Sequence, residues 1–269
     1  MKSLAGLTAA LVGVSFAAAT DHPWGYSAAN KSVAPPECWA DYYPTCGGHR
    51  QSPIDISTTE LCHHSTDEYP LWFDGECSDF TLSQTHEVFK SAVTSDSTCT
   101  VDANGATYDL VQFHLHAPSE HTLDGEAYDA EAHFVHNRTD GGSLLVIGLF
   151  FTASDDAETD PFFAEVIDTL GDVDEETATV LTLGSYSNLI EKAATGGHVF
   201  NYPGSLTTPG CSEIVDWWVV QKPLQISTDD LAWLHQRFEE EFSFYDDGYN
   251  ARPVQPLYGR TVTPYSASA

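Results

Sequence analysis

The sequence predicts a single, mainly β domain of the α+β class with a few short helices on its surface. Three observations favour this class. Two stretches, 109–116 and 131–136, alternate between polar and apolar residues and are joined by a short connection. The run 144–151 is continuously apolar and has the length of a buried strand. No repeat and no Pro- or Ser-rich linker divides the 269 residues, a length that one large β domain can reach.

The first alternating stretch, 109–116, places two histidines on one face of a strand. Successive side chains of a strand point to opposite faces of the sheet. The expected polar face comprises Leu110, Gln112, His114 and His116, and the apolar back comprises Val111, Phe113 and Leu115. Two imidazoles are therefore expected to point the same way above an apolar layer.

The second alternating stretch, 131–136, supplies a third histidine. Glu131, His133 and Val135 share one face of this strand. The connection 123–126 reads Leu-Asp-Gly-Glu and is short enough to make the two strands antiparallel neighbours. If His133 lies beside the first pair, three neutral imidazoles converge.

Three nitrogen ligands with no thiolate nearby are typical of a catalytic zinc ion, which keeps one coordination position open for water. Gln112 and Glu131 each precede a candidate ligand by two residues on its own face, and are predicted to fix the tautomers of the ligands. The alternative, unrelated surface histidines of an acidic protein, explains each histidine alone but not a polar face that carries them in this pattern. Ligand type leaves cobalt or cadmium open as substitutes for zinc.

The remaining strands and the N-terminal region are predicted from local pattern. Four aromatic residues near the N-terminus are expected to form a small cluster: Trp24, Tyr26, Trp39 and Tyr43. The alternation over 80–93 predicts a strand pair with His86 in its middle. The stretch 213–220 predicts another buried strand.

Three surface helices are predicted from apolar residues at helical spacing. They cover 161–170, 186–194 and 229–238. Ser227 or Thr228 is expected to cap the last of them, because a hydroxyl can accept a hydrogen bond from the first free main-chain N–H groups.

The first residues have the composition of a secretory signal. Lys2 is followed by an apolar run, 4–16, and by three alanines that end at Ala19. We expect residues 1–19 to be removed and 20–269 to form the mature domain in an extracellular or periplasmic-type compartment. The run is too short to span a bilayer, and no later stretch predicts a membrane helix or a lipid anchor.

Six cysteines suit such an oxidising compartment. They are Cys38, Cys46, Cys62, Cys77, Cys99 and Cys211, an even number that allows full pairing in many ways. The residues alone do not choose among these pairings. Two tripeptides, beginning at Asn30 and Asn137, could carry N-linked glycans in a host that makes them.

Forty acidic residues against ten basic ones give a formal net charge of −30. Nucleic acid and anionic membranes are therefore poor partners, because both are negatively charged themselves. The acidic residues are scattered, which a strongly solvated surface explains. Adaptation to a saline exterior is a sharper hypothesis, since salt screens self-repulsion that would otherwise destabilise the fold.

Seven short motifs stand out along the chain. They are Trp24-Gly-Tyr26, Arg50-Gln-Ser-Pro-Ile-Asp55, Gln112-Phe-His-Leu-His116, Ser119-Glu-His121, Glu131-Ala-His133, Tyr202-Pro-Gly-Ser-Leu-Thr-Thr-Pro209 and Asn250-Ala-Arg-Pro-Val-Gln-Pro256. Together and in this order they resemble the alpha-class carbonic anhydrases, and the junction 117–121 is similar to bacterial, plant and algal members. The resemblance implies a large, twisted, mostly antiparallel central β-sheet. It also implies zinc-dependent, reversible hydration of carbon dioxide to bicarbonate and a proton, by attack of a zinc-bound hydroxide.

The resemblance implies roles for further residues. His86 would carry protons between the metal-bound water and bulk solvent, which an imidazole does well near neutral pH. Glu120 would accept the hydroxyl hydrogen of Thr207, so that this hydroxyl admits only a zinc ligand with a proton to donate. The main chain near Asn250 would hold the ring of His116 from behind.

The same resemblance implies a substrate pocket with an apolar wall. Its residues would be Val135, Val146, Leu206, Thr208, Trp217 and Tyr26, the last of which lies at the mouth. Ser52 would hydrogen-bond the buried Glu120. In secreted members a disulfide ties the segment before the Arg-Gln-Ser-Pro motif to the one after Thr-Thr-Pro, which implies a Cys46–Cys211 bond that anchors the loop of Thr207.

Two other functions remain as alternatives. One is a catalytically silent member of the family used as a binding module. The complete set of candidate metal ligands, together with Glu120 and Thr207, argues against this alternative. The other is an acidic extracellular matrix or biomineral protein, for which we would expect long Asp- or Gly-rich repeats, and none occur. The predicted partners are carbon dioxide and bicarbonate, and no protein partner is indicated.

Overall fold

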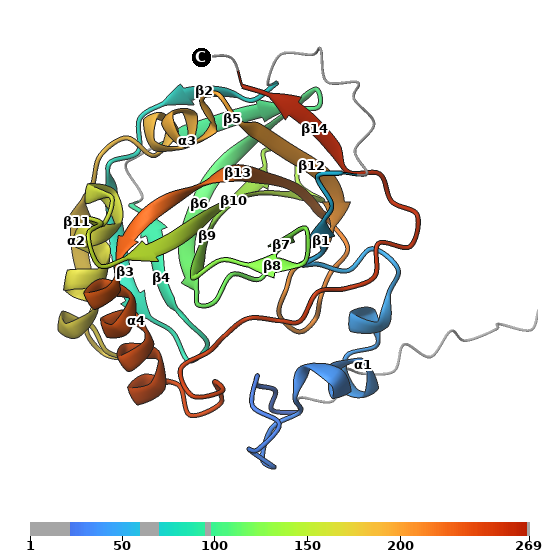
Figure 1. Ribbon diagram of the computed structural model, residues 1–269, viewed down its shortest axis with the longest axis vertical. Coiled ribbons are helices and arrows are strands. Elements are labelled where there is room, and N and C mark those ends of the chain that lie inside the picture. Colours follow the sequence, from blue (N-terminus) through green and yellow to red (C-terminus); the bar gives the residue numbers. More distant parts are fainter. Residues whose placement is uncertain (1–21, 60–69, 95–97, 268–269) are drawn as a thin grey trace, which may run out of the picture.

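One large sheet of 11 strands forms the body of the molecule in the computed structural model, which describes residues 22–59, 70–94 and 98–267 (Figure 1). Its continuous path runs through β11 (Thr179–Thr182), β3 (Asp79–Gln84), β4 (Phe89–Val93), β6 (Ala106–His116), β9 (Ala130–Arg138), β10 (Leu144–Ser154), β13 (Val215–Ser227), β12 (His198–Gly204) and β14 (Thr263–Ser266). Beside this path, β5 (Cys99–Ala103) pairs with β6 and with β2 (Trp72–Gly75). A small second sheet contains β1 (Asp55–Ile56), β7 (Thr122–Leu123) and β8 (Glu126–Ala127).

The large sheet is mostly antiparallel, which confirms the predicted fold class. Within the described residues, β10 and β13 form its one parallel pair. β10 lies between β9 and β13, and residues 145–151 of this strand are all buried. The continuous apolar run predicted as a buried strand therefore forms the centre of the sheet, where both faces are covered.

A β-bulge in β6 changes the expected faces of this strand. The pairing of β6 with β9 shifts register between Leu110 and Gln112. Leu110 therefore belongs to the apolar core, whereas Val111 is 37% exposed. The predicted faces were wrong at Leu110 and Val111, because the extra residue of a bulge reverses the alternation beyond it. The predicted alternation holds over 112–116, where the candidate ligands lie.

Three helices lie along the outer side of the curved sheet (Figure 1), as predicted: α2 (Pro161–Thr169), α3 (Tyr186–Ala194) and α4 (Thr228–Glu241). Each is capped by the residue before it, since the side chains of Asp160, Ser185 and Ser227 accept main-chain N–H groups of the first turn. The other helical elements are short: η1 (Pro36–Cys38), α1 (Trp39–Tyr42), η2 (Pro44–Gly47) and η3 (Leu170–Asp172). The helices bury apolar residues against the outer face and leave the inner face free for a site.

The predicted strand pair over 80–93 is formed by β3 and β4, and His86 lies in the turn between them, in the middle of the pair as predicted. Near the N-terminus, the rings of Trp24, Tyr26 and Trp39 are in mutual edge contact, which confirms the aromatic cluster for these three residues. The predicted strand over 213–220 begins at Val215.

The described residues contain two disulfides. Cys46 bonds to Cys211, as the resemblance implies, and Cys77 bonds to Cys99, a pairing that the residues alone left open. Cys38 has no disulfide within the described residues, and Cys62 lies outside them. The predicted signal, residues 1–19, also lies outside the described residues. No described helix has the length and apolar character needed to cross a membrane.

Candidate metal centre

Three histidines from two neighbouring strands meet on one face of the sheet. β6 and β9 pair with His114 opposite His133 and with His116 opposite Glu131. One ring nitrogen from each of the three histidines lies within 4.8 Å of the others. The antiparallel register thus brings together the side chains that the alternation assigns to one face.

Two of the rings are oriented by side chains two residues earlier on the same strand. Nδ1 of His114 donates to Oε1 of Gln112 at 3.0 Å. Nε2 of His133 donates to Oε1 of Glu131 at 2.9 Å. Because one nitrogen of each ring is used as a donor, Nε2 of His114 and Nδ1 of His133 are left with free lone pairs.

The third ring is held by the C-terminal segment. Nδ1 of His116 donates to the main-chain oxygen of Asn250 at 2.9 Å. The Asn250 side chain fastens this segment to the end of β6, since Oδ1 accepts the N–H of Ala117 and Nδ2 donates to the oxygen of Leu115. Nε2 of His116 is buried without a hydrogen-bond partner in the described part of the chain. This nitrogen is free to bind a metal.

Burial sets the charge of these groups. It lowers the pKa of His114 well below its usual value, and the neighbouring His116 and His133 lower this pKa further. Burial likewise lowers the pKa of His116. Both rings are therefore neutral at pH 7, which is the form that binds a metal. Burial would raise the pKa of Glu131, but the interactions of the carboxylate with the imidazoles of His121 and His133, including their hydrogen bonds, outweigh burial. The pKa of Glu131 therefore lies well below its usual value and the carboxylate stays ionised.

A buried hydrogen-bond chain behind the site was missed by the sequence analysis. Oε1 of Glu131 also accepts from Nδ1 of His121 at 2.7 Å. Nε2 of His121 lies 2.6 Å from the hydroxyl of Tyr202, which is hydrogen-bonded to Oγ of Ser52 at 2.9 Å. The predicted bond from Ser52 to Glu120 was wrong, because the Ser52 hydroxyl faces Tyr202 instead. The available signal was the position of His121 beside Glu120 in the Ser-Glu-His motif.

Glu120 lies beside the histidines with one oxygen free. Oε1 accepts the main-chain N–H of Arg252 at 2.9 Å. Oε2 is buried, has no hydrogen-bond partner among the described residues and lies 3.5 Å from Nε2 of His116. Thr207 is buried and lines the cavity described below. No hydrogen bond joins Thr207 to Glu120 in the described part of the chain, so the predicted pairing stays a prediction.

A cavity of about 420 Å³ opens above the three histidines. The predicted substrate-pocket residues all line it: Tyr26, Val135, Val146, Leu206, Thr208 and Trp217. Val146 and Trp217 are almost completely buried. Burial raises the pKa of Tyr26 well above its usual value, and the charge of Glu120 adds to this shift, so the phenol stays protonated. The cavity is therefore lined by apolar side chains and by hydroxyl groups.

His86 lines the same cavity from the turn between β3 and β4. Its side chain is 83% exposed, and Nε2 lies 3.4 Å from a carboxylate oxygen of Glu87. An imidazole in this place is in contact with both the cavity and the solvent.

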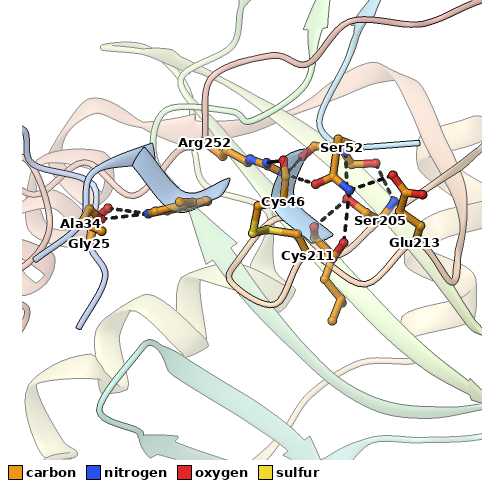
Figure 2. Close-up of a disulfide and its surroundings, with 11 residues drawn as sticks. Gly25, Ala34, Cys46, Ser52, Ser205, Cys211, Glu213 and Arg252 are labelled. Carbon is orange, nitrogen blue, oxygen red and sulfur yellow. Dashed lines mark hydrogen bonds between the residues drawn. A yellow bond between two sulfur atoms is a disulfide. The ribbon is translucent and has the colours of Figure 1, made fainter. Parts of the chain in front are cut away.

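Figure 2 shows the disulfide between Cys46 and Cys211. Cys211 closely follows Thr207 in the sequence, so the disulfide anchors the loop that carries Thr207. The main-chain oxygen of Cys211 accepts a hydrogen bond from the Gln51 side chain at 3.2 Å. The oxygen of Cys46 accepts one from the guanidinium of Arg252 at 3.1 Å. Arg252 thus links the disulfide to the segment that holds Glu120, a structural role that the sequence analysis missed.

The donor set fits zinc. Three imidazole nitrogens with no thiolate suit a zinc ion with one open position, and a metal would satisfy Nε2 of His116, which has no other partner among the described residues. A second group, formed by His121, Glu131 and His133, also lies within metal-binding distance. Its atoms are already committed, because Oε1 of Glu131 accepts hydrogen bonds from both imidazoles.

Comparison with known proteins agrees with this geometry. A model of the eukaryotic-type carbonic anhydrase family matches residues 34–266. A carbonic anhydrase of Klebsiella pneumoniae is 34% identical over 89% of each chain, and carbonic anhydrase 6 of Mus musculus is 30% identical over 83% of this chain and 76% of its own. The solved structure of the alpha-carbonic anhydrase of Thermovibrio ammonificans with sulfanilamide has a TM-score of 0.74 at 29% identity, over 91% of this chain and all of its own. The chain therefore belongs to the eukaryotic-type, or alpha, carbonic anhydrase family, the enzymes of carbon dioxide hydration.

Proposed function

We propose that this chain catalyses the zinc-dependent, reversible hydration of carbon dioxide to bicarbonate and a proton. The observation that carries the proposal is the set of three imidazole nitrogens, each oriented through the other nitrogen of its ring, at one end of a cavity with an apolar wall. A zinc ion held by His114, His116 and His133 would supply hydroxide near neutral pH by lowering the pKa of water, the chemistry for which carbonic anhydrase is the standard example.

The apolar wall is proposed to bind carbon dioxide. This substrate is neutral and has no hydrogen to donate, so it gains more from an apolar surface than water does. Val135, Val146 and Trp217 line the cavity on the side of β9, β10 and β13. Holding the carbon close to the metal centre converts an encounter in solution into a step within one complex.

Glu120 and Thr207 are proposed to orient the nucleophile. Oε2 of Glu120 is buried and has no hydrogen-bond partner among the described residues, so it is available to accept the hydrogen of the Thr207 hydroxyl. Once its hydrogen is donated to the carboxylate, the Thr207 oxygen can only accept. It would then hold a hydroxide by that hydroxide's own hydrogen and turn a lone pair toward the carbon.

His86 is proposed to carry the released proton to solvent. Its ring lines the cavity and is largely exposed, so one nitrogen can receive a proton from the site and the ring can pass a proton on to buffer. We also propose that the protein works in an oxidising compartment, as a secreted protein. The two disulfides support this location.

Carbon dioxide hydration by the purified, zinc-loaded protein tests the proposal when Thr207→Ala is compared with Thr208→Ala. Both variants remove a hydroxyl from the same cavity. Thr207→Ala is expected to retain zinc and to lose about a hundredfold in kcat/KM, whereas Thr208→Ala should lose far less. Equal activity of Thr207→Ala and the unmodified enzyme, with the metal intact, would remove Thr207 from the mechanism.

A further inference from the structure

Lys90 brings a positive charge to the cavity from the side opposite the apolar wall. It lies in β4 directly opposite His114 of β6, so the two side chains share one face of the sheet. The order of strands across the sheet is β4, β6, β9, β10 and β13. Lys90 therefore lies on one side of the metal centre, and Val146 and Trp217 lie on the other.

The Lys90 ammonium has no counter-ion in the described part of the chain. The other described lysines are engaged: Lys31 donates to the oxygen of Ala28, Lys192 pairs with Asp160 and Lys222 donates to the oxygen of Thr195. Lys90 makes no such hydrogen bond or ion pair within the described residues, although the protein carries 40 acidic residues. An unpaired cation that is half-buried in so acidic a chain needs a reason.

The cavity offers no other lysine or arginine among the described residues that line it. Glu87 also lines the cavity, but its ion-pair partner within the described residues is His86, at 3.4 Å. Lys90 is thus available for a negatively charged ligand that enters the cavity.

We propose that Lys90 is the anion-holding residue of the site, which attracts bicarbonate and competing small monoanions against the repulsion of the negatively charged protein. The inference rests on the proposed function, since bicarbonate is the product of that reaction. The two sides of the cavity then bind different ligands. The apolar wall takes the neutral substrate, and Lys90 holds the anion when it forms or when it enters for the reverse reaction. Because Lys90 lines the cavity, its charge acts on a ligand inside the cavity even when salt screens the net field of the protein.

Binding of the anion, rather than turnover, is the direct readout. The overall equilibrium between carbon dioxide and bicarbonate is fixed, so any fall in kcat/KM in one direction must appear equally in the other. The dissociation constant of the anion has no such constraint. It can be measured in the cobalt(II)-loaded protein from the visible absorption of the metal during titration with sodium bicarbonate and, separately, with sodium thiocyanate.

The variants are Lys90→Met, Lys90→Gln, Lys90→Arg and, as a matched control, Lys192→Met. The control removes the same charge from an exposed position on α3 that does not line the cavity. Lys90→Met and Lys90→Gln are expected to raise the dissociation constants of both anions about five- to tenfold at low salt, and less at high salt. Lys90→Arg and Lys192→Met should stay within about twofold of the unmodified protein, because the first keeps the local charge and the second changes only a distant one.

Unchanged anion affinity in Lys90→Met and Lys90→Gln, with full cobalt content, would overturn the proposal. An equal loss in Lys192→Met would also overturn it, because net charge rather than Lys90 would then be responsible. Failure of the proposed function is a separate outcome: zinc-loaded protein that does not hydrate carbon dioxide would refute the activity, while the anion titrations would still report on Lys90.

Discussion

The ring of His116 is held from behind by the main-chain oxygen of Asn250, which lies 2.9 Å from Nδ1 and 134 residues further along the chain. The bond closes the C-terminal segment over the end of β6. The bond fixes the tautomer of His116 through a main-chain oxygen from a distant part of the sequence. The orientation of this metal ligand therefore depends on the tertiary fold.

Replacing Asn250 with Ala should weaken zinc binding. The main-chain acceptor for His116 remains in this variant, but the side-chain bonds to Ala117 and Leu115 that position it are lost. We expect zinc affinity to fall about 10- to 100-fold, as is typical when a group that orients a ligand is removed. Competition with a chromogenic chelator measures this. Asn188→Ala, at an exposed position of α3, is the control. Unaltered affinity in Asn250→Ala would refute the positioning role.

Replacing His86 with Ala should slow proton release without loss of zinc. In weak buffer, turnover is expected to fall about tenfold, because the general acid–base group at the cavity mouth is gone. Small imidazole buffers should restore it. His198→Ala removes an exposed histidine that does not line the cavity. This control should leave turnover unchanged both in weak buffer and in imidazole buffer. Undiminished turnover of His86→Ala in weak buffer would exclude His86 as the proton carrier.

The two disulfides should differ in their contribution to stability. Cys46 and Cys211 are separated by 165 residues, whereas Cys77 and Cys99 are separated by 22. On the chain-entropy model, replacing both cysteines by serine lowers the free energy of unfolding by about 5 kcal/mol for the first pair and about 3 kcal/mol for the second. Urea unfolding of the two double variants measures the difference. A larger loss for the shorter loop would contradict the entropic account.

His136 should make the fold sensitive to acid. Burial lowers the pKa of this residue from 6.5 to about 4. At a pH between these two pKa values, His136 is protonated in the unfolded chain but not in the folded chain. The free energy of unfolding therefore decreases as the pH falls from 6.5 to about 4. The full loss is about 3 kcal/mol and is absent above pH 6.5.

His136→Asn is the matching variant, since its amide nitrogen can replace Nδ1 as the donor to the main-chain oxygens of Phe134 and Leu145. Urea unfolding at several pH values should show a shallower decline for His136→Asn than for the unmodified protein. Parallel curves would mean that His136 is not responsible for the acid sensitivity.

Local pattern could predict the elements that carry the ligands. The alternation over 112–116 and the short return to β9 were enough to bring three histidines together, because side-chain direction in a strand is a local property. The bulge at Val111 could not be predicted this way. It depends on how β6 pairs with β9, which the alternation of one strand does not encode.

Contacts between distant segments could not be predicted from the local sequence pattern. The buried hydrogen-bond chain from Glu131 through His121 and Tyr202 to Ser52 joins three separate parts of the sequence. The Ser-Glu-His motif draws attention to His121, but it does not indicate which residues His121 contacts. The Cys77–Cys99 pairing was equally hidden, because it follows from the pairing of β2 with β5, in which Gly75 lies opposite Cys99. The resemblance to a family supplied the position of Asn250 and the Cys46–Cys211 bond.

Metal removal and restoration test the central claim most directly. Carbon dioxide hydration is measured by stopped flow before chelation, after chelation and after an equimolar addition of zinc, for the unmodified protein and for His133→Ala. The account predicts that hydration disappears with the metal, returns with zinc in the unmodified protein and does not return in His133→Ala. Hydration at the original rate in the metal-free protein, or zinc bound in equimolar amount by the three histidines without any hydration, would contradict it.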